Sequence, residues 1–244
     1  YALTGIISVR DASEKALQII IDGQCDRGGY DYGYKKTDRW DMSVSGWQFQ
    51  AMKAGKLAGL SNTQLDSAIF KMLRFLREWT FTGQGWGYSG SNSSSIKGGG
   101  GGQTPQMTSV GALALQLYGY AHCKEARKAV EWLGKTQQFD WPKEGKVALY
   151  NYYYQTQVRF QHGDKFWTEW NNAFSQALVR EQKTDGHWEG SDHEGAAGQV
   201  YTTTMCALML QVYYRYLPSQ QKVEGITAPA AVKTVADDPV VKVL

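Results

Sequence analysis

The stretch KALQIIIDGQCDRGGY, residues 15–30, contains the pattern that decides the fold. A lysine–alanine pair precedes an apolar run, a glutamine follows, a glycine comes four residues later, and an aromatic residue stands two positions beyond it. Three more copies, two of them degenerate, follow with apolar anchors spaced 45 to 57 residues apart. Self-similarity at this spacing predicts stacked helical units. The marker residues of the copies are Gln24, Gly28, Tyr30, Trp86, Gln137, Gln182, Gly186 and Trp188.

The predicted helices alternate between two kinds along the chain. Helices of the first kind are charged and mixed, at 12–22, 64–79, 124–137 and 167–182. Helices of the second kind are poor in charge and rich in small and aromatic residues, at 42–58, 107–120, 147–161 and 200–216. A helix that is apolar nearly all round is buried, whereas one with a single apolar stripe faces water. We therefore expect an all-α domain in which outer and inner helices alternate in a two-layer ring or barrel.

The segments outside this alternation are expected to have other conformations. Residues 1–8 are apolar and interrupted by glycine, as at the end of an inner helix whose beginning is missing. Residues 89–102 are of low complexity, with glycine at every position from 98 to 102, and predict a mobile surface loop. The helical domain is expected to span residues 1–218, and residues 219–244 to form an extended tail or linker.

Composition narrows the function classes. The net charge is +3, and no Lys/Arg-rich block follows a helix face, so the chain is a poor candidate for nucleic-acid binding. No apolar run approaches the roughly 18–20 residues needed to span a bilayer. The three cysteines are widely spaced and include no CxxC pair, so they do not indicate a compartment. We predict no cofactor.

The repeat resembles the QW motif of the terpenoid cyclase and protein prenyltransferase superfamily. Other stretches are similar to bacterial prenyltransferase and squalene oxidase repeat proteins, over about residues 10–218: DMSVSGWQ at 41–48, YYYQTQ at 152–157, YTTT at 201–204 and VYYRYLP at 212–218. The resemblance implies an α/α toroid of outer and inner helix hairpins. Four hairpins are readable, fewer than such a ring usually contains, so we expect a partial or open toroid. Exposed inner helices would then contact another segment of the parent protein or another protein subunit.

The resemblance also defines what a catalytic residue would be. Cyclases of this superfamily protonate an alkene with the middle aspartate of an Asp-x-Asp-Asp-Thr-Ala motif. When the nearest segment is aligned on Asp41, Trp40 falls at the position of the acid. Arg39 would hold a neighbouring carboxylate ionised, which is the wrong state for a proton donor. We interpret Asp41 as an N-cap of the helix that starts at Met42, with a catalytic or ligand-contacting role as the alternative.

Metal chemistry has little support in the sequence. The superfamily's prenyltransferases hold zinc with an Asp-x-Cys pair and a distant histidine, and no Asp-x-Cys occurs in this chain. His187 and His193 lie among several carboxylates and are weak candidates for a divalent cation. Their spacing matches no site of fixed helix geometry, so we expect a solvated acidic turn rather than a metal site.

The centre of the ring is the remaining candidate site. Its residues would come from the inner helices and could hold an apolar or glycan-like ligand, or could close the space by packing on each other. The sequence therefore favours a non-catalytic binding or assembly module, part of a larger protein or complex. The alternatives are an isoprenoid-handling enzyme with an altered acid motif and a carbohydrate-active toroid. The cavity candidates are Asp41, Ser43, Trp47, Tyr150, Tyr153, Tyr154, Gln157, Tyr201 and Tyr213.

Overall fold

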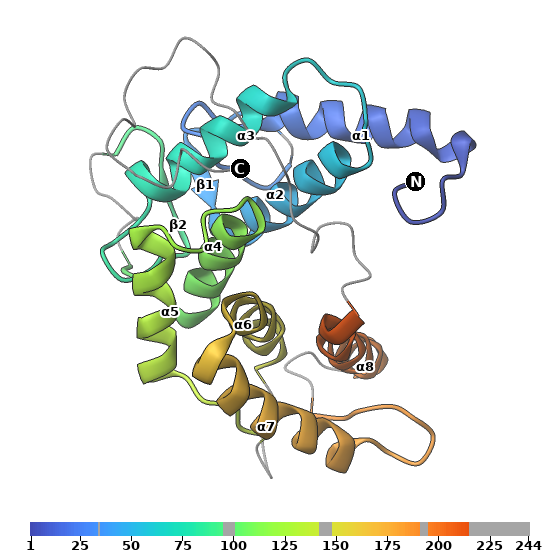
Figure 1. Cartoon of the computed structure of the whole chain (residues 1–244). Helices are drawn as coiled ribbons and strands as arrows, with labels where there is room; N and C mark the ends of the chain where they lie inside the picture. Colours follow the sequence, from blue (N-terminus) through green and yellow to red (C-terminus); the bar gives the residue numbers. More distant parts are fainter. Residues whose placement is uncertain (34, 95–100, 142–147, 191–194, 215–244) are drawn as a thin grey trace.

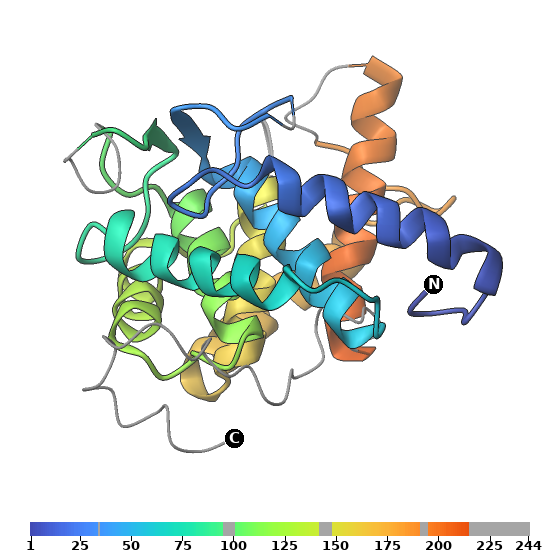
Figure 2. The same cartoon turned by 90° about the horizontal axis from the view of Figure 1, so that it is seen from above.

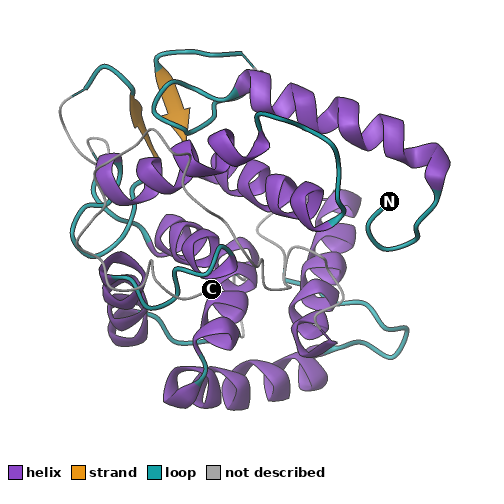
Figure 3. Cartoon of the chain, turned by 45° about the horizontal axis from the view of Figure 1, so that its top comes forward, coloured by secondary structure: helices purple, strands orange, loops and turns teal. Residues whose placement is uncertain are grey.

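A computed structural model describes residues 1–33, 35–94, 101–141, 148–190 and 195–214. Helices dominate these residues, as the sequence predicts (Figure 3). The helices are α1 Arg10–Gly23, α2 Met42–Leu57, α3 Leu65–Arg74, α4 Pro105–Leu117, α5 Lys124–Thr136, α6 Leu149–His162, α7 Asp164–Glu181 and α8 Gly195–Leu210. Two short strands, β1 Arg39–Asp41 and β2 Ser89–Ser91, form an antiparallel ribbon.

The helices lie in two layers that follow an arc (Figure 1). Helices α2, α4, α6 and α8 contact one another in succession and form the inner layer. Helices α1, α3, α5 and α7 lie outside them, and the view from above shows α1 and α3 flanking α2 (Figure 2). Burial separates the layers: eleven of the thirteen residues of α4 are buried, but only four of the thirteen residues of α5. The predicted alternation of inner and outer helices is thus present.

Indole groups of the repeat bind the ends of the outer helical segments. The Trp86 Nε1–H donates to the Leu76 carbonyl at 2.9 Å, and the Trp188 Nε1–H donates to the Leu178 carbonyl at 2.8 Å. Carbonyls in the last turn of a helix can lack an intrahelical donor, and an external donor satisfies them. The Leu178 carbonyl also accepts the Gln182 N–H at 3.2 Å, so the indole is a second donor there. Both indoles are buried, and each therefore closes its repeat with a shielded hydrogen bond.

The same aromatic residues are tied to the inner helices through their main chain. In three copies of the repeat, the aromatic residue's backbone N–H donates to a serine or threonine hydroxyl on an inner helix. The pairs are Tyr30 with Ser45 at 2.9 Å, Trp86 with Thr108 at 3.3 Å, and Trp188 with Thr203 at 3.2 Å. Each such residue thus connects one outer segment to one inner helix. These inner-layer hydroxyls were not part of the pattern found in the sequence.

Glutamine supplies the remaining contacts of the repeat. The Gln24 side-chain amide donates to the Gly28 carbonyl at 3.0 Å and to the Ala68 carbonyl of α3 at 2.9 Å. The Gln182 amide donates to the Gly186 carbonyl at 2.9 Å. Gln24 therefore holds its own turn and also links two outer helices.

The third copy replaces the indole with a guanidinium group. Arg159 Nη2 of α6 donates to the main-chain carbonyl of Gln137 at 2.7 Å and to that of Leu133 at 3.1 Å. The Arg159 side chain is buried and its guanidinium lies 4.6 Å from the centre of the Trp170 ring. Burial lowers the pKa of Arg159 to about 10. It still carries its charge at neutral pH, which two carbonyls and one aromatic face balance.

Two sequence expectations were wrong in detail. The low-complexity stretch starts with a strand, because Ser89–Ser91 pairs with Arg39–Asp41 in the ribbon. Three residues without apolar alternation gave no strand signal. At the amino terminus the chain forms turns and a 3₁₀ turn at Ile7–Val9, not the end of an α-helix. The tail at 219–244 and most of the glycine run lie outside the described residues.

A glycine in the first repeat provides a test of the stapled geometry. A Cβ at Gly28 would collide with the main-chain carbonyl of Lys71 in α3, whereas a Cβ at Gly33 would meet nothing within 4 Å. Both glycines have positive φ, +107° and +85°, so alanine incurs conformational strain at either position. We expect Gly28→Ala to lower the free energy of unfolding by about 1–3 kcal/mol more than Gly33→Ala, because only Gly28→Ala forces α1 and α3 apart.

Urea unfolding of both variants, followed by far-ultraviolet circular dichroism, measures this difference. Equal losses of stability in the two variants would contradict the close approach of Gly28 to α3.

Candidate functional site

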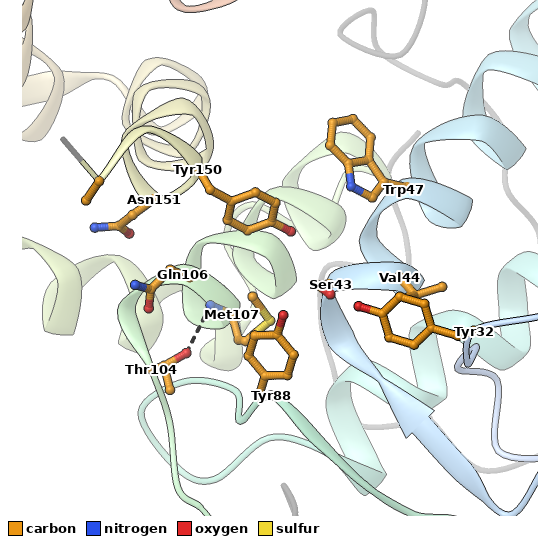
Figure 4. A pocket seen from close by; sticks show the side chains of 11 residues that line it. Tyr32, Ser43, Val44, Trp47, Tyr88, Thr104, Gln106, Met107, Tyr150 and Asn151 are labelled. Carbon is orange, nitrogen blue, oxygen red and sulfur yellow. Dashed lines mark hydrogen bonds between the residues drawn. The ribbon is translucent and has the colours of Figure 1, made fainter. Parts of the chain in front are cut away.

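A cleft of about 620 Å³ opens where the amino-terminal ends of three inner helices meet (Figure 4). Its volume is typical of small-molecule sites, which span about 300–1,000 Å³. Helix α2 contributes three lining residues, and α4 and α6, with the residues that precede them, contribute six; two tyrosines come from loops. The lining residues are Tyr32, Ser43, Val44, Trp47, Tyr88, Thr104, Gln106, Met107, Ala148, Tyr150 and Asn151.

The three helices begin in different ways, and this sets the polarity of the cleft. Fully buried Asp41 caps α2, since its Oδ1 accepts the N–H groups of Ser43 at 2.9 Å and Val44 at 3.2 Å. Thr104 caps α4 through the Met107 N–H at 3.3 Å. Helix α6 follows Ala148, which has no side chain able to cap, and no side-chain cap is formed. Among the described residues, the first-turn N–H groups of α6 thus have no capping side chain.

Three tyrosine hydroxyls converge in the cleft. Figure 4 shows the hydroxyls of Tyr32, Tyr88 and Tyr150 pointing toward one another from two loops and from α6. The Tyr150 oxygen is buried and has no hydrogen-bond partner among the described residues; the nearby Tyr154 hydroxyl affects its pKa without meeting hydrogen-bond geometry. Burial raises the pKa of Tyr150, so its hydroxyl stays protonated at neutral pH. A buried hydroxyl without a partner is costly, and a ligand could satisfy it.

Aromatic faces form the outer part of the cleft. Trp47 is 45% exposed, Tyr88 50% and Tyr32 65%, so all three present ring surface to solvent. Trp47 is held in place from behind by a stacked Tyr153 ring, 6.2 Å between centroids, and by the edge of Tyr154 at 5.8 Å. Its orientation is therefore fixed before any ligand arrives.

Charge is neutralised beside the cleft rather than inside it. Arg39 Nη2 lies 2.9 Å from Asp41 Oδ2, and the same guanidinium also pairs with Asp31. None of the eleven lining residues carries a charge. The residue at the cyclase acid position, Trp40, is buried and packs edge-on against Phe75 with centroids 5.3 Å apart. The capping role predicted for Asp41 is confirmed, and its carboxylate is engaged by a cation.

The structure divides the nine cavity candidates into separate groups. Ser43, Trp47 and Tyr150 line the cleft, and Asp41 supports it from below as the cap of α2. Three candidates are buried between inner helices and pack rather than line: Tyr153, Tyr154 and Gln157. Tyr201 is half-buried on α8, and Tyr213 packs against Trp167 and Phe174 near α7.

One of the two metal candidates, His187, lies on a turn and is partly exposed. His187 Nδ1 is 2.6 Å from Asp185 Oδ1, and Glu189 pairs with Lys183 at 3.0 Å. His193 lies outside the described residues. Among the residues that are described, no three His, Cys, Asp or Glu side chains gather as a metal site. The described part of this turn has the features of a solvated ion-pair cluster.

Eight lining residues were not singled out from the sequence: Tyr32, Val44, Tyr88, Thr104, Gln106, Met107, Ala148 and Asn151. Most of them stand within a few residues of the start of an inner helix. A signal for them existed, because inner helices that all follow an outer helix run in the same direction and bring their first turns to one end. Tyr88 had no such signal, since its position depends on the ribbon.

A buried lysine on α2 was also missed. Lys53 is 1% exposed, and no carboxylate of the described residues pairs with it. Desolvation alone lowers its pKa to about 8. The stem of the side chain packs in the core, and the charge on its ammonium group is disfavoured there.

The comparisons with known proteins do not indicate a function, so the function is inferred from the cleft. Neither protein-family models nor curated proteins gave a match to this chain. Within the described segments, no helix is both long enough and apolar enough to cross a bilayer.

The lysine predicts a specific pH dependence of stability. Its pKa is about 8 in the fold and has an ordinary value of 10.5, so between these values the unfolded chain binds the proton more tightly. The free energy of unfolding contributed by Lys53 therefore rises from pH 8 to pH 10.5, and the full penalty applies below pH 8. We expect Lys53→Met to raise stability at pH 7 by roughly 3 kcal/mol and to flatten the profile above pH 8.

Denaturant unfolding of wild type, Lys53→Met and exposed Lys135→Met between pH 7 and pH 10 checks this. A Lys53→Met profile parallel to that of wild type would contradict the lowered pKa.

Proposed function

We propose that this chain is a non-catalytic binding module with the fold of a partial α/α toroid. The inner and outer layers of the arc, and the staples that join them, support the toroid assignment. The observation that carries the function is the cleft at the shared amino-terminal end of the inner helices. It combines solvent-facing rings, converging hydroxyls and an uncapped helix in one volume, the features of a small-molecule site.

The electrostatics argue against the isoprenoid cyclase alternative. Alkene protonation needs a protonated carboxylic acid that faces the substrate. Asp41 is fully buried, accepts two main-chain N–H groups and the Ser43 hydroxyl, and pairs with Arg39, so both of its carboxylate oxygens are engaged within the fold. A core indole occupies the next position, Trp40. A ligand in the cleft would therefore be bound without being protonated.

Binding at the cleft can be followed at one methyl group. Met107 lines the cleft, whereas Met209 is buried in α8 away from it. We expect members of a neutral fragment library to shift the ¹³C-methyl NMR signal of Met107 and to leave that of Met209 unchanged. Ala148→Trp fills the cleft and should abolish the shifts, while Lys124→Trp on the surface of α5 should preserve them.

Two results would overturn the proposal. One is a Met107 signal that no fragment shifts, or that shifts equally in Ala148→Trp. The other is turnover of squalene or farnesyl diphosphate by the purified chain, which would make the protein an enzyme.

The free edge of the arc supports an assembly role for the same module. A groove of about 270 Å³ runs between α1 and α2, lined by small residues that include Ala51 and Ala54 of α2 and Ala58 at its C-cap. Gly46 of α2 faces Val110 of α4, so the groove lies on a different side of the helix. Among the described helices, α4 and α6 each have an inner neighbour on both sides, whereas α2 has one. The groove has the position of a further inner helix in the series.

We propose a second copy of the chain as the occupant of this groove. The other end of the arc offers exposed apolar side chains, with Val200 68% and Tyr213 43% exposed. Packing of α8 of one copy beside α2 of the next would extend the inner series head to tail. Such a contact is heterologous, so copies add in one direction until a ring closes.

Sedimentation equilibrium tests this contact. We expect concentration-dependent association of the purified chain, lost in Ala54→Arg because a charged side chain then fills the apolar groove. Thr168→Arg, on the exposed face of α7, should associate as wild type does. A chain that remains monomeric at all accessible concentrations would refute a second copy as the partner.

A further inference from the structure

We infer that the ligand of the cleft is a neutral saccharide. The inference rests on the proposed binding function and adds the chemical class of the ligand. Three observations carry it: the lack of charge in the lining, the high share of hydrogen-bonding groups, and the exposed aromatic rings.

The charge of the lining sets the charge of the ligand. Among the described residues, none of the eleven that line the cleft is charged, and the guanidinium of Arg39 on the ribbon is already shared by Asp31 and Asp41. A diphosphate or other multiply charged group needs several free cations to replace its hydration. Such a ligand would lose hydration free energy on entering this cleft, and its interaction with the amino-terminal ends of the helices would not compensate for that loss. The cleft is therefore suited to a neutral molecule.

The hydrogen-bonding groups of the lining disfavour a purely hydrocarbon ligand. Only Val44, Met107 and Ala148 lack a hydrogen-bonding side-chain group, and the other eight lining residues have one. Three of these eight groups already have partners within the chain: the Ser43 hydroxyl donates to Asp41, the Thr104 hydroxyl accepts the Met107 N–H, and the Asn151 amide bonds to Gln137 and Gln155. Desolvating the other five against an apolar ligand would cost free energy at each group left unpaired. The Tyr150 hydroxyl is already buried without a partner. A ligand with many hydroxyls satisfies these groups, whereas a polyisoprenoid leaves them unsatisfied.

The geometry of the polar groups favours vicinal hydroxyls. Three tyrosine hydroxyls point into one volume from different directions (Figure 4), and each can donate and accept. The Gln106 side chain adds a planar amide with a donor beside an acceptor. Adjacent hydroxyls of a sugar present the same pairing of donor and acceptor. The first turn of α6, which no described side chain caps, places main-chain N–H groups at the same end of the helix, and such groups suit hydroxyl oxygens.

The exposed rings provide faces for the apolar side of a sugar. Pyranose rings carry C–H groups on one face, and these pack on the electron-rich face of an aromatic ring. Trp47 is the best such face, because stacking on Tyr153 holds it while 45% of its surface stays exposed. Tyr88 and Tyr32 present two further rings at the rim.

Saturation-transfer difference NMR on the purified chain tests the inference. The probes are neutral oligosaccharides (cello-, malto- and manno-oligosaccharides), farnesol, and blocked neutral tripeptides. We expect transfer to oligosaccharide protons, and titration should show affinity lowered about tenfold or more in Trp47→Ala. Tyr150→Phe should lose about fivefold, as for one hydrogen bond. Trp79→Ala and Tyr214→Phe, which change aromatic residues outside the cleft, should bind as wild type does.

The outcomes separate the ligand class from the proposed function. Farnesol or tripeptide binding that depends on Trp47, without saccharide binding, would overturn the saccharide inference and leave the binding function standing. Saccharide binding that is unchanged in Trp47→Ala and Tyr150→Phe would place the sugar elsewhere and also overturn the inference. Met107 shifts from the fragment library with no saccharide transfer would likewise reject the saccharide alone.

Discussion

Side chains donate hydrogen bonds to carbonyl groups at the ends of the outer helical segments, and these bonds tie the outer layer of the structure to the inner one. In two repeats the donor is an indole N–H, from Trp86 or Trp188. The same residue donates its main-chain N–H to a hydroxyl on an inner helix. One residue thus fixes the distance between the layers. The inner helices then start at a common level, and their first turns meet at one cleft.

Much of the fold could be predicted from the sequence, because the repeat and the alternation of helix types report directly on burial. Helix α2 starts at Met42 as its capping aspartate indicates, and α5 falls within one residue of its predicted range. The ribbon could not be predicted, since Ser89–Ser91 pairs with a segment far away in sequence and contains no apolar residue. Local pattern carries no information about such a contact.

The cleft was predicted less well than the fold. Ser43, Trp47 and Tyr150 were found because they stand on inner helices near aromatic neighbours. Tyr153 and Tyr154, on the same helix as Tyr150, instead fill the space between inner helices. Helical spacing alone cannot tell which of these residues lines the cleft, because that depends on how far each residue lies from the amino-terminal end of its helix. Only residues in the first turns do so, and that depth follows from the stapled layers.

Each staple closes within its own repeat: the indole donor and the carbonyl acceptor are ten residues apart in both cases. A unit of this kind brings its own connection between the layers, so a duplicated gene segment would add one helical pair together with its staple. The number of pairs then determines the curvature and the size of the central space. In such a lineage, the size of the ligand that fits the central space would change more readily when whole helical pairs are gained or lost than when single residues within a pair are substituted.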